Sequence, residues 1–70
     1  MLTHRAPPDY KVGDFVKEVY NDEQGTIQEV DWSVGFGTWA YKILRATDSR
    51  YGGKAGTEVW VYQGFYLRKL

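Results

Sequence analysis

Apolar and polar residues alternate in short runs along this chain, and glycine-rich or polar breaks separate the runs. Val, Ile, Thr and aromatic residues dominate the runs, which is typical of β-strands. No run keeps a helical period over a useful length. The pattern therefore predicts five strands, at about residues 11–20, 25–32, 38–45, 58–62 and 66–69.

The spacing within the strands predicts which side chains face the core. Ile27 and Val30 are three residues apart, so the second strand must bend or bulge if both face one core. Lys42 and Glu58 should point outward, which directs their neighbours inward and turns Trp60 and Tyr62 to the opposite face. The predicted core is Val16, Ile27, Val30, Trp39, Tyr41, Ile43, Val59, Val61 and Leu67.

The segments between the predicted strands contain residues that favour turns. Residues 21–25 read as a polar turn, in which Gly25 is expected to take a positive φ. Asp14 is expected to order its own turn by accepting backbone N–H groups. Residues 63–65 are short enough for one 3-10 turn. Pro7 and Pro8 disfavour a helix, so residues 1–9 are expected to form an extended arm, mobile over residues 1–8, before one domain over 10–70.

Composition narrows the class of protein. The chain has 70 residues, no cysteine and a single histidine, His4, so we expect no disulfide, no metal site and no cofactor. Its stability must come from a core rich in large side chains, and 17% of its residues are aromatic. It lacks the apolar run of a signal peptide or a membrane span, so a cytoplasmic, non-membrane protein is expected.

Charge is balanced overall but uneven along the chain. The net charge is +0, which argues against a generic nucleic-acid binder. Residues 1–37 carry three basic and seven acidic side chains (−4), and residues 38–70 carry six basic and two acidic ones (+4). This asymmetry permits one basic and one acidic face, with a mixed solvated surface as the alternative.

Four short segments resemble the Src-homology-3-like small barrels, among them KOW domains, Tudor domains and short bacterial or phage barrels. The segments are Gly13-Asp14-Phe15-Val16, Gly25-Thr26-Ile27, Trp60-Val61 and Leu67. The resemblance covers about residues 11–70. It implies an all-β, five-stranded, strongly bent barrel with a short 3-10 turn before the last strand. It does not fix a function, because this barrel hosts many unrelated roles.

The departures from these families are specific. A KOW domain is typically basic around its first turn, where this chain carries Asp22 and Glu23. The peptide-binding motifs of Src-homology-3 domains are missing, so recognition of PxxP segments does not carry over. A Tudor domain builds an aromatic cage for a methylated cation, and the rings available for such walls are Trp32, Phe36, Trp39 and Tyr62.

Catalytic chemistry has little support, and we expect no enzyme. His4 has no nucleophile near it in sequence, and the scattered carboxylates show no catalytic spacing. The Gly-rich segment 52–57 fails the phosphate-loop pattern, because its Gly-Lys is not followed at once by Ser or Thr.

The aromatic residues are the best functional lead, because a barrel this small cannot enclose them all. The leading hypothesis is a non-catalytic module that binds a protein or protein assembly through exposed aromatic residues, which anchor many interfaces. Its predicted site is Trp32, Phe36, Trp60, Tyr62 and Tyr66. The alternatives are simple packing, self-association, or a KOW-like surface for nucleic acid or ribonucleoprotein. The residues predicted for that surface are Arg45, Arg50, Lys54 and Arg68.

Overall fold

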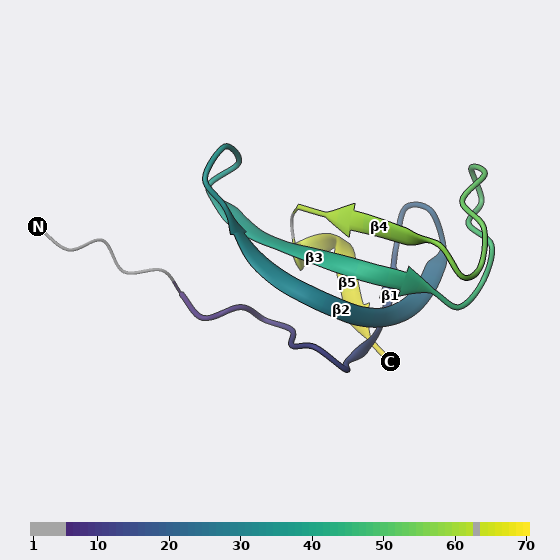
Figure 1. The fold of residues 1–70 in the computed structure, drawn as a ribbon, viewed down its shortest axis with the longest axis horizontal. Helices are drawn as coiled ribbons and strands as arrows, with labels where there is room; N and C mark the ends of the chain where they lie inside the picture. Colours follow the sequence, from purple (N-terminus) through teal and green to yellow (C-terminus); the bar gives the residue numbers. More distant parts are fainter. Residues whose placement is uncertain (1–5, 63) are drawn as a thin grey trace, which may run out of the picture.

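The computed structural model describes residues 6–62 and 64–70, and across them the chain forms five antiparallel strands and one short 3-10 turn (Figure 1). The elements are β1 (Phe15–Glu18), β2 (Glu23–Ser33), β3 (Thr38–Arg45), β4 (Glu58–Val61), the 3-10 turn η1 (Gly64–Tyr66) and β5 (Leu67–Lys69). They form one sheet in the order β4-β3-β2-β1-β5. The all-β prediction is confirmed. Within the described residues β4 and β5 do not pair, so the sheet is open and the closed barrel stays a prediction.

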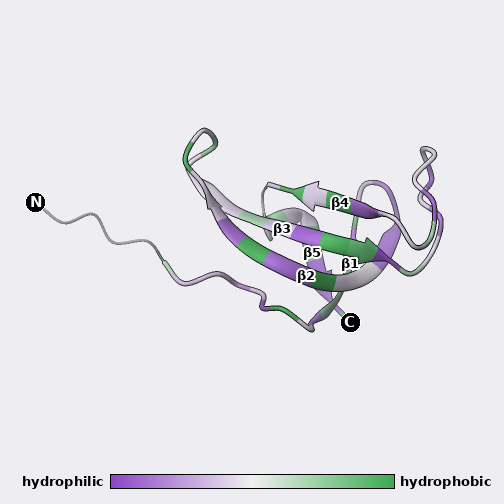
Figure 2. Cartoon of the chain, viewed as in Figure 1, coloured by the Kyte–Doolittle hydropathy of each residue, from purple (hydrophilic) through white to green (hydrophobic). Residues whose placement is uncertain are grey.

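A bulge in β2 aligns two core residues that are three apart. Ile27 lies opposite Ile43, whereas Glu29 lies opposite Lys42, so Gln28 is an extra residue in β2. Beyond the bulge Val30 lies opposite Tyr41. The extra residue shifts the alternation by one and keeps both apolar side chains on the core face. The predicted bend or bulge is confirmed, and Figure 2 shows hydrophobic and hydrophilic residues alternating in bands along β2.

The first strand is shorter than predicted. Residues 11–14 form a tight turn in which Asp14 N donates to the Lys11 carbonyl at 3.0 Å and Gly13 has a φ of 95°. The Asp14 side chain accepts from Lys11 N at 3.0 Å, as expected. The β3 bounds match the prediction, and β4 and β5 differ from it by one residue each.

The turn between β1 and β2 is tighter than predicted. Glu23 and Gln24 already pair with β1, so only residues 19–22 connect the two strands. The left-handed position is Asp22, whose φ is 59°, and not Gly25. Asp tolerates this conformation better than most residues. The expectation of a positive φ at Gly25 is therefore wrong.

The core is one hydrophobic cluster to which all five strands contribute, with buried members from β1, β2, β3, β4 and β5. Its buried members are Val16, Ile27, Tyr41, Ile43, Val61 and Leu67, and Tyr10, Val30, Trp39, Val59 and Tyr66 pack against it half-buried. Every residue predicted for the core belongs to this cluster. Sequence reasoning missed Tyr10, whose ring meets Tyr41 edge-on at 5.5 Å and whose hydroxyl donates to the Leu67 carbonyl.

The described part of the predicted arm is attached to β3. The Trp39 indole N–H donates to the Ala6 carbonyl at 2.7 Å, and Asp9 N donates to the Tyr41 hydroxyl at 3.0 Å. Residues 1–5 of the arm, with His4, lie outside the described residues. In the part of the chain that the structure describes, no helix has the length and apolarity that a membrane crossing requires.

Candidate functional site

A hollow of about 420 Å³ lies beside β4, one edge of the open sheet. It lies between that edge and the β1–β2 turn and η1. Its walls are the aromatic residues Tyr20, Phe36, Trp60, Tyr62 and Tyr66, its polar members are Glu18, Asn21 and Glu23, and its aliphatic members are Val59 and Val61. We call this hollow the aromatic groove. Four of the five residues predicted as a partner site therefore line one surface, although they come from separate elements.

The rings of the groove form two groups. The Phe36 and Tyr62 centroids lie 4.9 Å apart, and the Trp60 ring is stacked 6.4 Å from Tyr62. On the other side Tyr20 and Tyr66 meet edge-on at 4.8 Å. Phe36 is 67% exposed and Tyr62 40% exposed, whereas Trp60 and Tyr66 are half-buried. The groove thus presents aromatic faces that the fold itself does not cover.

Trp32, the fifth predicted residue, lies in an adjoining hollow of about 160 Å³ that shares Trp60 and Tyr62 with the groove. Its ring meets Trp39 edge-on at 5.3 Å across the β2–β3 ladder. Trp60 lies opposite Lys42 in the β3–β4 ladder, with the ammonium 5.9 Å from its ring centroid. Trp60 therefore lies on the Lys42 face, as the alternation predicts.

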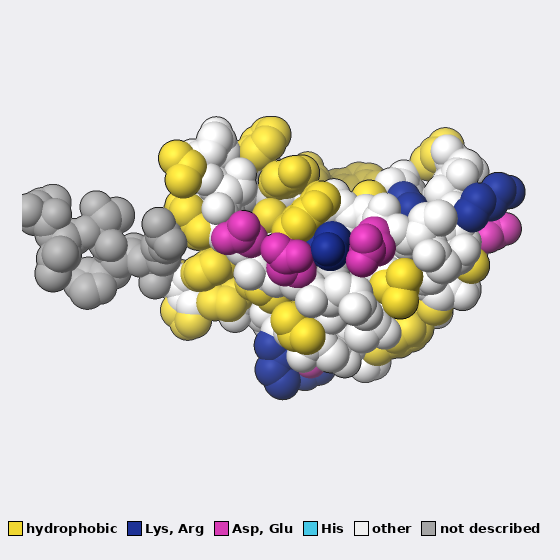
Figure 3. Space-filling view, in the orientation of Figure 1, with side chains coloured by type: hydrophobic (Ala, Val, Ile, Leu, Met, Phe, Trp, Pro, Cys, Tyr) yellow, Lys and Arg dark blue, Asp and Glu magenta, His cyan; other side chains and the backbone are white. Residues whose placement is uncertain are grey.

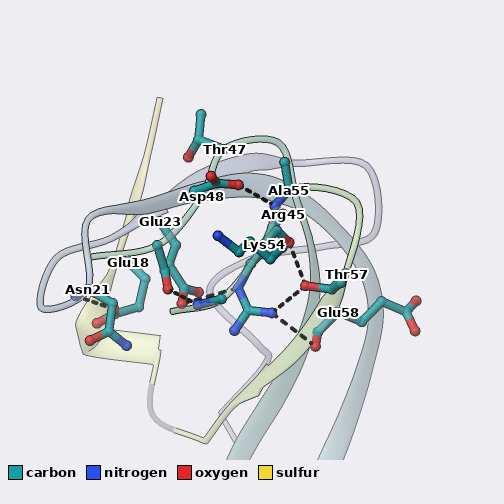
Figure 4. A network of polar contacts seen from close by, with 12 residues as sticks. Glu18, Asn21, Glu23, Arg45, Thr47, Asp48, Lys54, Ala55, Thr57 and Glu58 are labelled. Atoms are coloured by element: carbon teal, nitrogen blue, oxygen red, sulfur yellow. Dashed lines mark hydrogen bonds and ion pairs between the residues drawn. The ribbon is translucent and has the colours of Figure 1, made fainter. Parts of the chain in front are cut away.

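Two buried carboxylates complete the groove, and sequence reasoning missed both. Glu18 and Glu23 lie opposite each other at the end of the β1–β2 ladder, and they are 6% and 3% exposed (Figure 4). The two oxygens of Glu18 accept the backbone N–H groups of Tyr20 at 2.9 Å and Asn21 at 2.7 Å. Glu18 thereby holds the tight turn. Alternation from Val16 does place Glu18 on the core face, which was the available signal.

Arg45 balances one of these carboxylates. Its Nε lies 3.2 Å from Glu23 Oε1, as an ion pair without hydrogen-bond geometry (Figure 4). Its Nη1 donates to Thr57 Oγ1 at 2.8 Å and lies 3.4 Å from the Glu58 carbonyl. The backbone of Gly53 lies so close to the guanidinium that a Cβ there would approach it within 2.5 Å. All of these partners of the Arg45 guanidinium lie within the chain, so Arg45 is a structural residue.

The other residues of the predicted basic surface are placed differently. Arg50 and Lys54 are exposed on the β3–β4 loop, where Arg50 is 3.9 Å from Asp22. Arg68 is exposed on β5, at the other edge of the sheet from β4. The structure therefore brings Arg50 and Lys54 onto one loop, but it does not gather the four residues around a common hollow.

The charges of the two halves interleave. Lys42 pairs with Glu29 at 3.2 Å and with Glu58 at 3.8 Å. The hydrogen bond to Glu29, followed by the charge of Glu58, raises the pKa of Lys42 above its ordinary value. Lys69, from the basic half, lies 3.6 Å from Asp14. Figure 3 shows acidic and basic side chains in one row on the visible face. Antiparallel pairing thus sets basic residues of one half beside acidic residues of the other.

Two further findings bear on chemistry. Within residues 6–62 and 64–70, no group of three or more His, Cys, Asp or Glu side chains is placed to hold a metal ion. Comparison of the chain with protein-family models, with curated proteins and with solved structures gave no match.

Proposed function

We propose that this chain is a non-catalytic interaction module that binds a larger protein or a protein assembly through the aromatic groove. The observation that carries the proposal is the convergence of Phe36, Trp60, Tyr62 and Tyr66 on one hollow. Each buried aromatic ring removes roughly 150–250 Å² from water, so covering the exposed rings is a strong driving force for association. Trp and Tyr are the residues that most often dominate such interfaces.

We further propose that the sheet belongs to the Src-homology-3-like barrels. Two features support this. The first strand pairs with both β2 and β5, and the chain reaches β5 through a single 3-10 turn. That turn crosses the open end of the sheet, where Val19 N donates to the Tyr66 carbonyl at 2.9 Å. On this proposal the aromatic groove occupies the seam where the barrel is not closed by hydrogen bonds.

Affinity capture with the full chain tests the binding proposal. The tagged chain is compared with Phe36→Ala and Trp60→Ala in native-cell lysate, with bound proteins identified by mass spectrometry and each melting temperature recorded. Tyr51→Ala is the control, because Tyr51 is 75% exposed on the β3–β4 loop and lies outside the groove. Truncating an anchor of this kind costs about 2 kcal/mol or more, which is roughly 30-fold in affinity.

The expected result is loss of the partner by Phe36→Ala and Trp60→Ala and its retention by Tyr51→Ala, with Phe36→Ala melting like the natural chain. The proposal fails if both groove variants keep their partner. It also fails if an Arg50/Lys54 double alanine variant alone loses binding and the interaction weakens steeply with salt. That second pattern is the signature of phosphate contacts and would assign the chain to nucleic acid.

A further inference from the structure

We infer that the protein partner supplies an extended, uncharged segment that pairs with the free edge of β4 as a sixth strand, inside the aromatic groove. This inference rests on the proposed function and names the form in which the partner enters the groove. Two observations carry it: the direction of the main-chain groups of β4, and the set of residues that line the groove.

The main-chain groups of Glu58 and Trp60 point away from β3. Arg45 N donates to the Thr57 carbonyl at 2.9 Å, and from this pair the register runs regularly along β4. Every second pair of an antiparallel ladder exchanges hydrogen bonds, so the residues between those pairs direct their N–H and C=O groups outward. Glu58 and Trp60 are such residues, and the Glu58 carbonyl lies 3.4 Å from Arg45 Nη1. Across the described residues β4 is the outermost strand, so no strand receives its outward groups (Figure 1).

The residues that line the groove place this edge along it. Side chains alternate along a strand, so Val59 and Val61 point to one face of the sheet and Trp60 to the other. All three nevertheless line the groove, together with Tyr62. Consecutive residues from both faces border one hollow when the hollow runs along the edge of their strand. The groove therefore gives an incoming chain access to the outward N–H and C=O groups of β4.

β4 is the less protected of the two edges of the sheet. At the other edge, β5 carries Arg68 and Lys69 in a strand of three residues, and charged side chains of this kind discourage pairing with another chain. β4 carries one charged residue, Glu58, at its first position, and three apolar residues follow it. An exposed edge of this composition is a template for a further strand, in which main-chain hydrogen bonds supply the affinity.

The far wall of the groove restricts the occupant to a single chain. That wall is formed by the β1–β2 turn and η1, through Tyr20, Asn21 and Tyr66. The hollow of about 420 Å³ has the size of a pocket for a small ligand, which leaves room for a short segment. A second copy of the chain would instead bring the sheet behind its own β4 against that wall. Because β-branched residues favour the extended conformation, we expect a segment rich in Val, Ile and Thr.

Backbone N-methylation of a probe peptide tests the main-chain pairing. The probe is an acetylated and amidated peptide with alternating Val and Thr residues between Gly/Ser flanks. Two further peptides carry N-methyl groups on alternate central residues, each blocking one edge, and the last carries them on every central residue. Each peptide is titrated into the full chain and followed by tryptophan fluorescence. We expect at least one single-edge peptide to bind within about threefold of the probe, and the fully methylated peptide at least about tenfold more weakly.

Amide exchange in the full chain identifies the edge that the probe occupies. The Trp60 N–H points away from β3 and should exchange at least about tenfold more slowly when the probe is bound. The N–H groups of Val59 and Val61 already point to β3, so they are internal controls and should change by less than about twofold.

A variant pair removes one outward donor from β4. Glu58→Pro deletes the outward N–H at the first residue of the strand, where proline is tolerated, and should weaken binding of the probe at least about threefold. Glu58→Ala keeps that N–H and is the matched control, with binding expected within about twofold of the natural chain. Melting temperatures of both variants are recorded, and the exchange rate of the Trp60 amide decides the question if Glu58→Pro unfolds.

Edge pairing is refuted if the probe does not bind, if the fully methylated peptide binds as tightly as the probe, or if the Trp60 amide exchanges at the same rate in the bound chain. It is also refuted if the chain alone sediments as a dimer with this amide protected, because a second copy then occupies the edge. These results leave the proposed function intact as long as Phe36→Ala and Trp60→Ala still lose the natural partner. Retention of that partner by both variants defeats the proposed function itself, whatever the peptides do.

Discussion

Gly25 on β2 lies directly against the main chain of Leu44 on β3. A side chain built at Gly25 would overlap the Leu44 carbonyl oxygen and approach Ile43 Cγ2 within 2.7 Å. Glycine is required here by the close approach of two strands rather than by an unusual backbone conformation. The sequence motif that contains this glycine thus marks a packing constraint in the sheet.

Gly25→Ala should destabilise the fold by roughly 1–3 kcal/mol, because the added methyl group forces the two strands apart. Gly35→Ala is the matched control, since nothing lies within 4 Å of its Cβ position. Urea unfolding of both variants checks the prediction. A Gly25→Ala midpoint at or above that of the natural chain contradicts it.

Ile43→Ala should cost roughly 2–5 kcal/mol, through lost burial and the cavity that remains. Ile43 is 2% exposed and lies opposite both Ile27 and Val59, at the centre of the cluster. Val34→Ala, at an 84% exposed position on the β2–β3 turn, should change stability by no more than about 0.5 kcal/mol. Equal thermal shifts for the two variants would show that the core is elsewhere.

Arg45→Met should destabilise the chain strongly, because it leaves the Glu23 carboxylate buried without its counterion. Breaking one side of such a pair typically costs about 3–5 kcal/mol, whereas replacing both partners is often close to neutral. The Arg45→Met/Glu23→Gln double variant should therefore recover much of the loss. Chemical denaturation of Arg45→Met, Glu23→Gln and the double variant gives the three free energies of unfolding for a double-mutant cycle. If the two single losses add up to the loss in the double variant, the ion pair contributes no coupling energy.

Asp14 should make stability depend on pH in the acid range. The backbone N–H of Lys11, followed by the charges of Lys11 and Lys69, holds the pKa of this carboxyl below its ordinary value of 3.8. The unfolded chain therefore binds the proton first, and the stabilisation is complete above that value and is lost as pH falls through the lower folded pKa. Asp14→Asn should be less stable than the natural chain near neutral pH, and the gap should close towards about pH 2. Melting temperatures across this range check it, and a constant gap would contradict the assignment.

The fold was predictable from the sequence where the pattern is local. The composition of β3 and the turn residues on either side of it predicted its bounds, alternation around Lys42 predicted its inward face, and the three-residue spacing from Ile27 to Val30 predicted the bulge. The start of β2 was not predictable in this way. Glu23 and Gln24 have the composition of a turn, and Glu23 is buried because Arg45, 22 residues later, lies beside it.

The site was predictable only in part. Phe36, Trp60, Tyr62 and Tyr66 could be selected because a small core cannot enclose them, and they do line one groove. Their spatial grouping, and the depth at which Glu18 lies among them, depend on how the tight β1–β2 turn faces β4. That relation joins segments some 40 residues apart in sequence, and no local pattern encodes it.

The bulge at Gln28 fixes the register between β2 and β3. If Gln28 were paired in a regular strand, Ile27 and Val30 would face opposite sides of the sheet, and no shift of one strand along the other would bring both to the core. With the bulge, a slip by one position in either direction turns apolar side chains towards water on both sides of the irregularity. Deleting Gln28 would therefore leave Ile27 and Val30 on the same face of a regular ladder, whereas deleting one of the paired residues of β2 would reverse the facing of the residues that follow it.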